Sequence, residues 1–136
     1  RKFDLIVVDS TDPIGPGEVL FTESFYKDCA RCLTADGIVV NQNGVPFLQG
    51  QEVTDTYRRR KPHFTDVGFY VAAVPTYVGG FMALGWASRS TRPGAETVET
   101  IRSRFAAAPV ATRYYTPDLH KAAFALPRFV QDLIQD

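Results

Sequence analysis

The sequence predicts an α/β fold built on an open sheet with an antiparallel hairpin at its edge, and three observations indicate it. Residues 5–8 are four aliphatic residues, three of them β-branched, a pattern typical of a strand buried on both faces. Residues 38–40 form a second such run after a helical pattern. Residues 67–75 and 81–88 then have the pattern of two long strands joined by a Val-Gly-Gly turn.

The helices that follow the first two strands are predicted from local start and stop signals. Thr22 is a suitable N-cap for a helix that ends near residue 33, and Asp36-Gly37 would end the connection after it. A second helix is predicted over residues 49–57. The four cations at residues 58–61 are interpreted as its solvated end, because a helix C-terminus favours positive charge.

Three further helices are predicted toward the end of the chain. The spacing of apolar residues predicts an amphipathic helix over residues 95–107. Thr116-Pro117 supplies an N-cap and a first-turn proline for the next helix, and Pro127 begins another that reaches residue 134. His120 has no second histidine or acidic partner at ligand spacing, so we interpret it as a structural residue.

Charge and length limit the classes of function. The 136 residues are 45% apolar, which is enough for a core, and Lys plus Arg equal Asp plus Glu at 15 each. A balanced charge argues against binding to nucleic acid or to a membrane surface, since both favour a basic excess. No apolar run approaches the roughly 18 residues of a membrane span. We therefore expect a soluble, cytoplasmic protein with neither kind of partner.

Cys29 and Cys32 form a Cys-x-x-Cys pair, which in isolation suggests a redox or zinc site. The pair lies within a helical pattern, with Phe25 and Leu33 on the same face. No second cysteine pair is present to complete a four-ligand zinc site. We interpret both residues as buried core thiols and expect no metal.

Two carboxylates and two hydroxyls follow the first strand, at Asp9, Ser10, Thr11 and Asp12. In an open α/β sheet, ligands bind at this edge, and carboxylates three residues apart can lie about 10 Å apart in an extended chain. That span suits a small dication. Asp9 could accept a proton from an amine, which otherwise titrates near 10.4, while Asp12 holds a second ammonium. An Asp-Pro turn whose side chains only cap the backbone is the alternative.

The motifs of this chain resemble those of the spermidine synthase family of polyamine aminopropyltransferases. The first comprises residues 8–16, with Leu-Phe and Phe-Tyr pairs at 20–21 and 25–26. The second is Pro-Thr-Tyr at 75–77 with Gly-Gly-Phe at 79–81. The third runs from Tyr114-Tyr115 into 120–127. They fall in the family's order and at about its spacing, so the resemblance covers nearly the whole chain.

The resemblance implies a Rossmann-like, class I methyltransferase-type fold with the strand order 4-5-7-6 of the family. It implies transfer of an aminopropyl group from decarboxylated S-adenosylmethionine to putrescine, which gives spermidine and methylthioadenosine. Decarboxylated S-adenosylmethionine would be a co-substrate, with no permanently bound cofactor. The full-length enzyme would be a homo-oligomer, a dimer or a tetramer. A related amine N-methyltransferase, or a non-catalytic half that pairs with a complete subunit, are the alternatives.

The resemblance also implies roles for individual residues. Gln42, among the polar residues that end the second strand, would face the site, although capping of the strand end explains it equally well. Tyr77 would orient the attacking nitrogen, and Ser10 and Thr11 would line the same turn. Pro16 would contact the adenosine product.

Features of the family that precede these motifs are missing from the sequence. It has no glycine-rich turn followed by a ribose-binding acid, and no small amino-terminal β domain. Residues 1–136 are therefore interpreted as a partial catalytic domain, namely its carboxyl-terminal half. We expect this half to be inactive alone and to leave one edge of its first strand unpaired. Gly15 and Gly17 make the segment after Asp12 pliable, which suits either a lid over the substrate or a plain connection.

Overall fold

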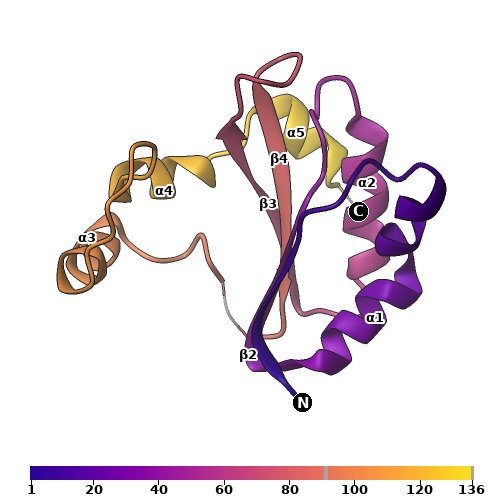
Figure 1. The fold of residues 1–136 in the computed structure, drawn as a ribbon, viewed down its shortest axis with the longest axis horizontal. Helices are drawn as coiled ribbons and strands as arrows, with labels where there is room; N and C mark the ends of the chain where they lie inside the picture. The colour runs from indigo at the N-terminus through magenta and orange to yellow at the C-terminus, as the bar shows by residue number, and fades with distance from the viewer. Residues whose placement is uncertain (91, 136) are drawn as a thin grey trace.

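A four-stranded mixed sheet forms the centre of the computed structural model, which describes residues 1–90 and 92–135 (Figure 1). The strands are β1 (Phe3–Val8), β2 (Leu33–Gln42), β3 (Asp66–Ala73) and β4 (Phe81–Ser88). Their spatial order is β1-β2-β4-β3, with β1 parallel to β2 and the other pairs antiparallel. This order confirms the predicted arrangement, including the hairpin at the edge.

Helices cover both sides of the sheet. They are the 3-10 helix η1 (Gly15–Phe21) and the α-helices α1 (Glu23–Cys32), α2 (Gly50–Arg60), α3 (Val98–Ala107), α4 (Pro117–Ala123) and α5 (Arg128–Leu133). Figure 1 shows α1, α2 and α5 on one side and α3 and α4 on the other. The predicted caps are confirmed, since the hydroxyls of Thr22 and Thr116 accept hydrogen bonds from the backbone N–H groups of Phe25 and Leu119.

The start of β2 differs from the prediction, because β2 begins directly after α1. Phe3 pairs with Leu33 and Leu5 pairs with Ile38, so residues 34–37 bulge opposite Asp4. A Cβ atom at Gly37 would lie 3.0 Å from the carbonyl oxygen of Phe3, which explains a glycine there. Asp36-Gly37 therefore belongs to a bulge within the strand and not to a connection before it.

The core lies between the sheet and the α1/α2 side. One cluster joins α1 to β2 and β4 through Tyr26, Cys29, Ala30, Leu33, Val39, Phe64 and Ala87. A second joins α2 to β3 and β4 through Val53, Phe69 and Ala83. Ile6 and Val8 of β1 pack on the first cluster, whereas Leu5 and Val7 are 56% and 67% exposed. Burial of β1 on both faces was a wrong prediction, because β1 is an edge strand with one open face.

Two predictions about side-chain burial are also corrected. Cys29 is buried as predicted, but Cys32 is exposed, because it lies at the last residue of α1, beyond the contact with the core. Arg60 is fully buried, with its guanidinium 4.7 Å from the centre of the Tyr26 ring, so residues 58–61 are not all solvated. Arg60 lies on the buried face of α2 together with Val53 and Thr56.

The remaining features are the environment of His120 in α4, the grouping of possible metal ligands, and the length and polarity of the helices. His120 shares a hydrogen bond of 3.0 Å with the Tyr115 hydroxyl and packs against Phe124, as expected of a structural residue. Within residues 1–90 and 92–135, no three His, Cys, Asp or Glu residues are grouped so that they could hold a metal ion. None of the helices in that part of the chain has the length and apolar character needed to cross a membrane.

Candidate functional site

The ends of β1 and β2 meet at one edge of the sheet because the two strands are parallel and Val8 pairs with Asn41. The side chain of Gln42 joins these ends. Its amide nitrogen Nε2 donates to the carbonyl oxygen of Ser10 at 2.8 Å, and its Oε1 accepts from the N–H of Gly44 at 2.9 Å. Gln42 therefore caps the strand ends, one of the two roles that the sequence left open.

A pocket of about 510 Å³ lies at this edge of the sheet. Six of its lining residues are ones that the sequence analysis selected, namely Asp9, Ser10, Thr11, Asp12, Gln42 and Tyr77. Gly44, Val45, Gln49, Val74, Met82 and Leu84 complete the lining. Pro16, in η1, is not part of this lining. The structure thus brings together six of the seven selected residues, and Gln42 both caps the strands and faces the pocket.

Tyr77 reaches the pocket from the turn between β3 and β4. The N–H of Gly80 donates to the carbonyl oxygen of Tyr77 at 2.8 Å, and the N–H of Tyr77 donates to that of Val74 at 3.1 Å. Gly79 and Gly80 have φ angles of 92° and 64°, values that favour glycine. The two glycines therefore allow the tight turn that holds Tyr77 at the edge where β1 and β2 end.

The carboxylates of Asp9 and Asp12 have no hydrogen-bond or ion-pair partner among the described residues. Both side chains are exposed. The hydroxyl oxygen of Ser10 is buried and also lacks a partner in that part of the chain. A pocket with two unpaired negative charges and a free hydroxyl is suited to a cationic ligand that can donate hydrogen bonds.

The segment after Asp12 is packed against the turn that carries the carboxylates. η1 follows this turn, and a Cβ atom at Gly17 would lie 2.8 Å from the hydroxyl oxygen of Thr11 and 2.9 Å from the carbonyl oxygen of Asp12. A glycine is needed where two backbones approach so closely. The segment therefore contains a short helix, and both a lid and a plain connection stay predictions.

The loop from β2 to α2 contributes residues that the sequence analysis missed. Gln49 lines the pocket, and its Oε1 accepts from the N–H of Val45 at 2.9 Å. Gly44 has a φ of 66°, and a Cβ atom there would lie 2.4 Å from that same Oε1. Gly44, directly after the polar end of β2, could have indicated from the sequence that a side chain packs closely against the backbone there.

Glu52, in the first turn of α2, is the second residue that was missed. Burial and the negative charge of Asp12 raise the pKa of Glu52 to about 7, although a hydrogen bond from the Asn43 side chain opposes this shift. The sequence could have indicated Glu52 by its spacing of three residues from Gln49, because this spacing places both side chains on one side of the helix.

Buried amides hold this edge in place behind the pocket. The Nδ2 of Asn41 donates to the Oδ1 of Asn43, and the Nδ2 of Asn43 donates to the hydroxyl of Thr56 at 2.9 Å. The N–H of Gly85 donates to the same Oδ1 of Asn43 at 3.1 Å. This network ties the end of β2 to α2 and β4, so the pocket rests on rigid elements.

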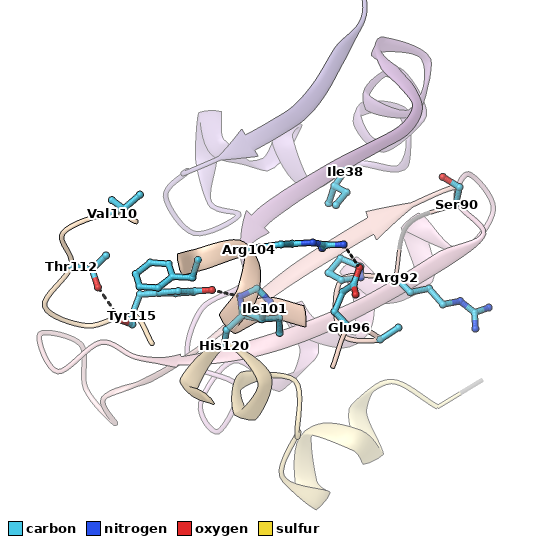
Figure 2. Close-up of a pocket in the computed structure, with 13 residues that line it drawn as sticks. Ile38, Ser90, Arg92, Glu96, Ile101, Arg104, Val110, Thr112, Tyr115 and His120 are labelled. Atoms are coloured by element: carbon cyan, nitrogen blue, oxygen red, sulfur yellow. Dashed lines mark hydrogen bonds and ion pairs between the residues drawn. The ribbon is translucent and has the colours of Figure 1, made fainter. Parts of the chain in front are cut away.

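A larger cavity, of about 990 Å³, lies between the sheet and the α3–α4 side (Figure 2). Several of its charged and polar side chains contact one another. Arg104 forms an ion pair of 3.0 Å with Glu96, and Tyr115 is hydrogen-bonded to His120 (Figure 2). Because these groups are already paired, the pocket with free carboxylates is the better candidate for a polar substrate.

Comparison with known proteins identifies the family. A sequence model of the spermine/spermidine synthase domain matches residues 1–96. The polyamine aminopropyltransferase of Ruegeria sp. (strain TM1040) is 60% identical over 132 residues, which are 97% of this chain and 46% of that protein. The polyamine aminopropyltransferase of Shigella sonnei (strain Ss046) is 52% identical over 134 residues, which are 98% of this chain and 46% of that protein.

Solved structures agree with this comparison. A spermidine synthase crystallised with the transition state analogue AdoDATO superposes with a TM-score of 0.87 at 33% identity, over 98% of this chain and 45% of the other. The spermidine synthase of Thermotoga maritima gives a TM-score of 0.83 at 32% identity, over 98% and 44%. The chain thus spans about half the length of the curated relatives it matches. It has the Rossmann-like fold of these synthases and belongs to the spermine/spermidine synthase family.

Proposed function

We propose that the protein containing this chain transfers an aminopropyl group from decarboxylated S-adenosylmethionine to putrescine, forming spermidine and methylthioadenosine. The observation that carries the proposal is the pocket at the ends of β1 and β2, where two unpaired carboxylates, Asp9 and Asp12, lie with Tyr77. The names of the relatives and the analogue bound to a related synthase support the same reaction.

The reaction requires a base and correct positioning of the amine. An alkyl ammonium titrates near 10.4, so the attacking nitrogen must first lose a proton, and Asp9 accepts it. The nitrogen then attacks the aminopropyl carbon next to the sulfonium. A C–N bond forms, the C–S bond breaks with its electron pair going to sulfur, and the proton leaves to solvent through Asp9. The leaving group is a neutral thioether, so no general acid is needed.

The other residues of the pocket position the substrates. Asp12 holds the distal ammonium of putrescine and thereby selects the length and direction of the acceptor. Tyr77 orients the attacking nitrogen, while Gln42, Ser10 and Thr11 complete the wall of the site. Pro16 contacts the adenosine part of the product. No metal is required, decarboxylated S-adenosylmethionine is consumed as a co-substrate, and the intact protein acts in the cytoplasm as a homo-oligomer, a dimer or a tetramer.

A product assay tests this proposal. The intact protein that contains this chain is incubated with putrescine and either decarboxylated or ordinary S-adenosylmethionine, and the products are identified by mass spectrometry. We expect spermidine and methylthioadenosine in equal amounts from the decarboxylated donor alone. Methylated putrescine from ordinary S-adenosylmethionine would instead identify an amine N-methyltransferase.

The Asp12→Ala variant tests the role of the second carboxylate in the same assay. We expect the KM for putrescine to rise about tenfold or more, while the KM for butylamine changes little, because only the diamine has a distal ammonium that loses its partner. An equal effect on both amines would exclude Asp12 from this role and leave the reaction itself unaffected.

A further inference from the structure

Glu52 lies beside the pocket although it is not part of its lining. It is three residues after Gln49, which precedes α2 and lines the pocket, so both side chains project from the same side of the helix. Its neighbours in the helix, Val53 and Thr56, are fully buried against the sheet. Thr56 is hydrogen-bonded to Asn43, whose side chain also acts on the Glu52 carboxyl group. Glu52 is therefore located between α2 and the polar end of β2.

Helix capping does not account for this carboxyl group. A glutamate at the third position of a helix commonly accepts a hydrogen bond from the backbone N–H of the N-cap residue. Here that N–H, of Gln49, donates to the carbonyl oxygen of Val45 at 2.8 Å instead. The Oε1 of Glu52 is buried and accepts no hydrogen bond from any of the described residues. A carboxylate oxygen in this state is available to interact with a cation.

Asp12 is the charged group that acts on Glu52. It lies in the turn after β1, and its negative charge disfavours ionisation of Glu52. Of the charged groups on the elements packed against α2, Lys27 of α1 is exposed and most others have partners elsewhere in the described structure. Arg128 pairs with Asp132 on α5, Arg31 with Asp28 on α1, Glu23 with His63, and Arg92 with Asp66 of β3, while β4 has no charged residue.

We propose that Glu52 is a positioning residue, which acts with Asp12 as a carboxyl pair for the distal ammonium of the acceptor and couples diamine binding to proton release. The inference rests on the proposed function. Burial and the charge of Asp12 both favour the protonated form of Glu52; a bound ammonium would neutralise the charge of Asp12 and would itself attract the Glu52 carboxylate, which favours its ionisation. Both carboxyl groups would then be ionised around the cation, and the site would prefer a diamine to an amine with one charge.

The proposal predicts a specific pH dependence. Because the pKa of Glu52 is raised to about 7, its carboxyl group is protonated below this pH and ionised above it. The diamine should therefore bind more tightly as the pH rises through 7. Glu52→Gln in the intact protein should remove this dependence of putrescine binding on pH near 7. It should raise the KM for putrescine at pH 8 about tenfold, with kcat within about threefold of wild type.

Asp55→Asn is the matched control, because it removes one negative charge from the same helix at a residue that is hydrogen-bonded to Gln51. Its KM profile should follow that of wild type between pH 6 and 9. A pH dependence that Glu52→Gln leaves unchanged would overturn the inference. A wild-type KM that is flat through pH 7 would do the same, whether or not the variant folds.

Calorimetry measures the coupling without turnover. Putrescine is titrated into the intact protein at pH 7 in two buffers with different ionisation enthalpies. Wild type and Asp55→Asn should release about half a proton more than Glu52→Gln, since a group at its pKa is half protonated. Equal release in all three would refute the role of Glu52. If instead none of the proteins, wild type included, makes spermidine, the proposed function has failed.

Discussion

At the scale of single residues, the assignment of Asp9 as the base depends on its position and not on a special environment. Asp9 is exposed in this chain and lines the pocket with Asp12 and Tyr77. In the proposed reaction, its contribution would be its placement next to the amine, where a carboxylate can accept a proton in the transition state. Coverage of the site by the bound donor would add to this effect by excluding water.

Asp9→Asn should lower kcat of the intact protein by about 10²–10⁴-fold, because the amide cannot accept the proton. Binding of methylthioadenosine, measured by calorimetry, should stay nearly unchanged. Asp28→Asn is the control, since Asp28 forms an exposed ion pair with Arg31, and it should leave kcat within about twofold. A turnover of Asp9→Asn within about threefold of wild type would exclude Asp9 as the base.

Arg60 is a buried cation without a carboxylate partner in the described structure. Its Nε and both terminal nitrogens lack hydrogen-bond partners there, and its planar group lies over the Tyr26 ring. Burial lowers the pKa of the guanidinium, with Tyr26 and Cys29 acting in the opposite direction. Contact with an aromatic ring offsets only part of the desolvation of a buried charge.

Arg60→Leu should therefore raise the free energy of unfolding by about 1–2 kcal/mol, as is found when well-packed apolar residues replace buried charges. Urea denaturation of the intact protein measures the change. Arg58→Leu, at an exposed position two residues earlier in α2, should change the stability by less than about 0.5 kcal/mol. A loss of stability in Arg60→Leu would show that the guanidinium has a favourable partner.

At the scale of elements, local signals predicted more than long-range ones. The caps at Thr22 and Thr116 and the turn at residues 78–80 depend on a few neighbouring residues, and each was found where expected. The bulge at residues 34–37 depends on pairing with β1, which lies about 30 residues earlier in the chain. A turn signal such as Asp-Gly cannot distinguish a connection from a bulge without that pairing.

The sequence predicted those residues of the candidate site that lie at strand ends and in the hairpin turn. Asp9 and Gln42 lie close together because parallel strands end at the same edge, and Tyr77 joins them because the hairpin turns there. Glu52 was missed because its environment is set by burial in the fold and by Asp12, 40 positions earlier in the sequence. Burial of Arg60 was missed for the same reason, since its neighbour Tyr26 comes from another helix.

The β3–β4 turn connects backbone conformation to function. Gly80→Ala would place a side chain at a φ of 64°, where alanine is strained, so the variant should lose about 1 kcal/mol of stability. Because the N–H of Gly80 also donates to the carbonyl oxygen of Tyr77, a shifted turn should raise the KM for putrescine. Gly94→Ala is a poor control because Phe124 fills that space, and Ala72→Gly within β3 is better.

Kinetics and urea denaturation of the intact protein separate the two effects of Gly80→Ala. We expect the KM for putrescine to rise by more than that caused by Ala72→Gly, even where the two variants lose similar stability. Equal KM values in both would mean that the position of Tyr77 does not depend on the glycine turn.

At the scale of the whole molecule, β1 leaves one face and one edge of the sheet uncovered. Phe3, Leu5 and Val7 are exposed on this strand, and its outer edge has no partner strand among the described residues. The chain spans about half the length of the curated relatives it matches. An uncovered apolar strand edge favours association with another chain.

Residues 1–136 produced alone should therefore self-associate and form no detectable spermidine. Catalysis requires the donor to be held in line with the amine, and the chain has no glycine-rich turn followed by a ribose-binding acid, so the effective concentration of the reacting carbon at Asp9 would be low. Sedimentation velocity and the product assay measure both properties. Leu5→Lys should shift the sedimenting species toward the monomer, because a charge on an edge strand opposes pairing, whereas Val110→Lys, at an exposed residue outside the sheet, should not. Spermidine formation at the rate of the intact protein by a monomer of residues 1–136 would mean that a complete donor site lies within these residues.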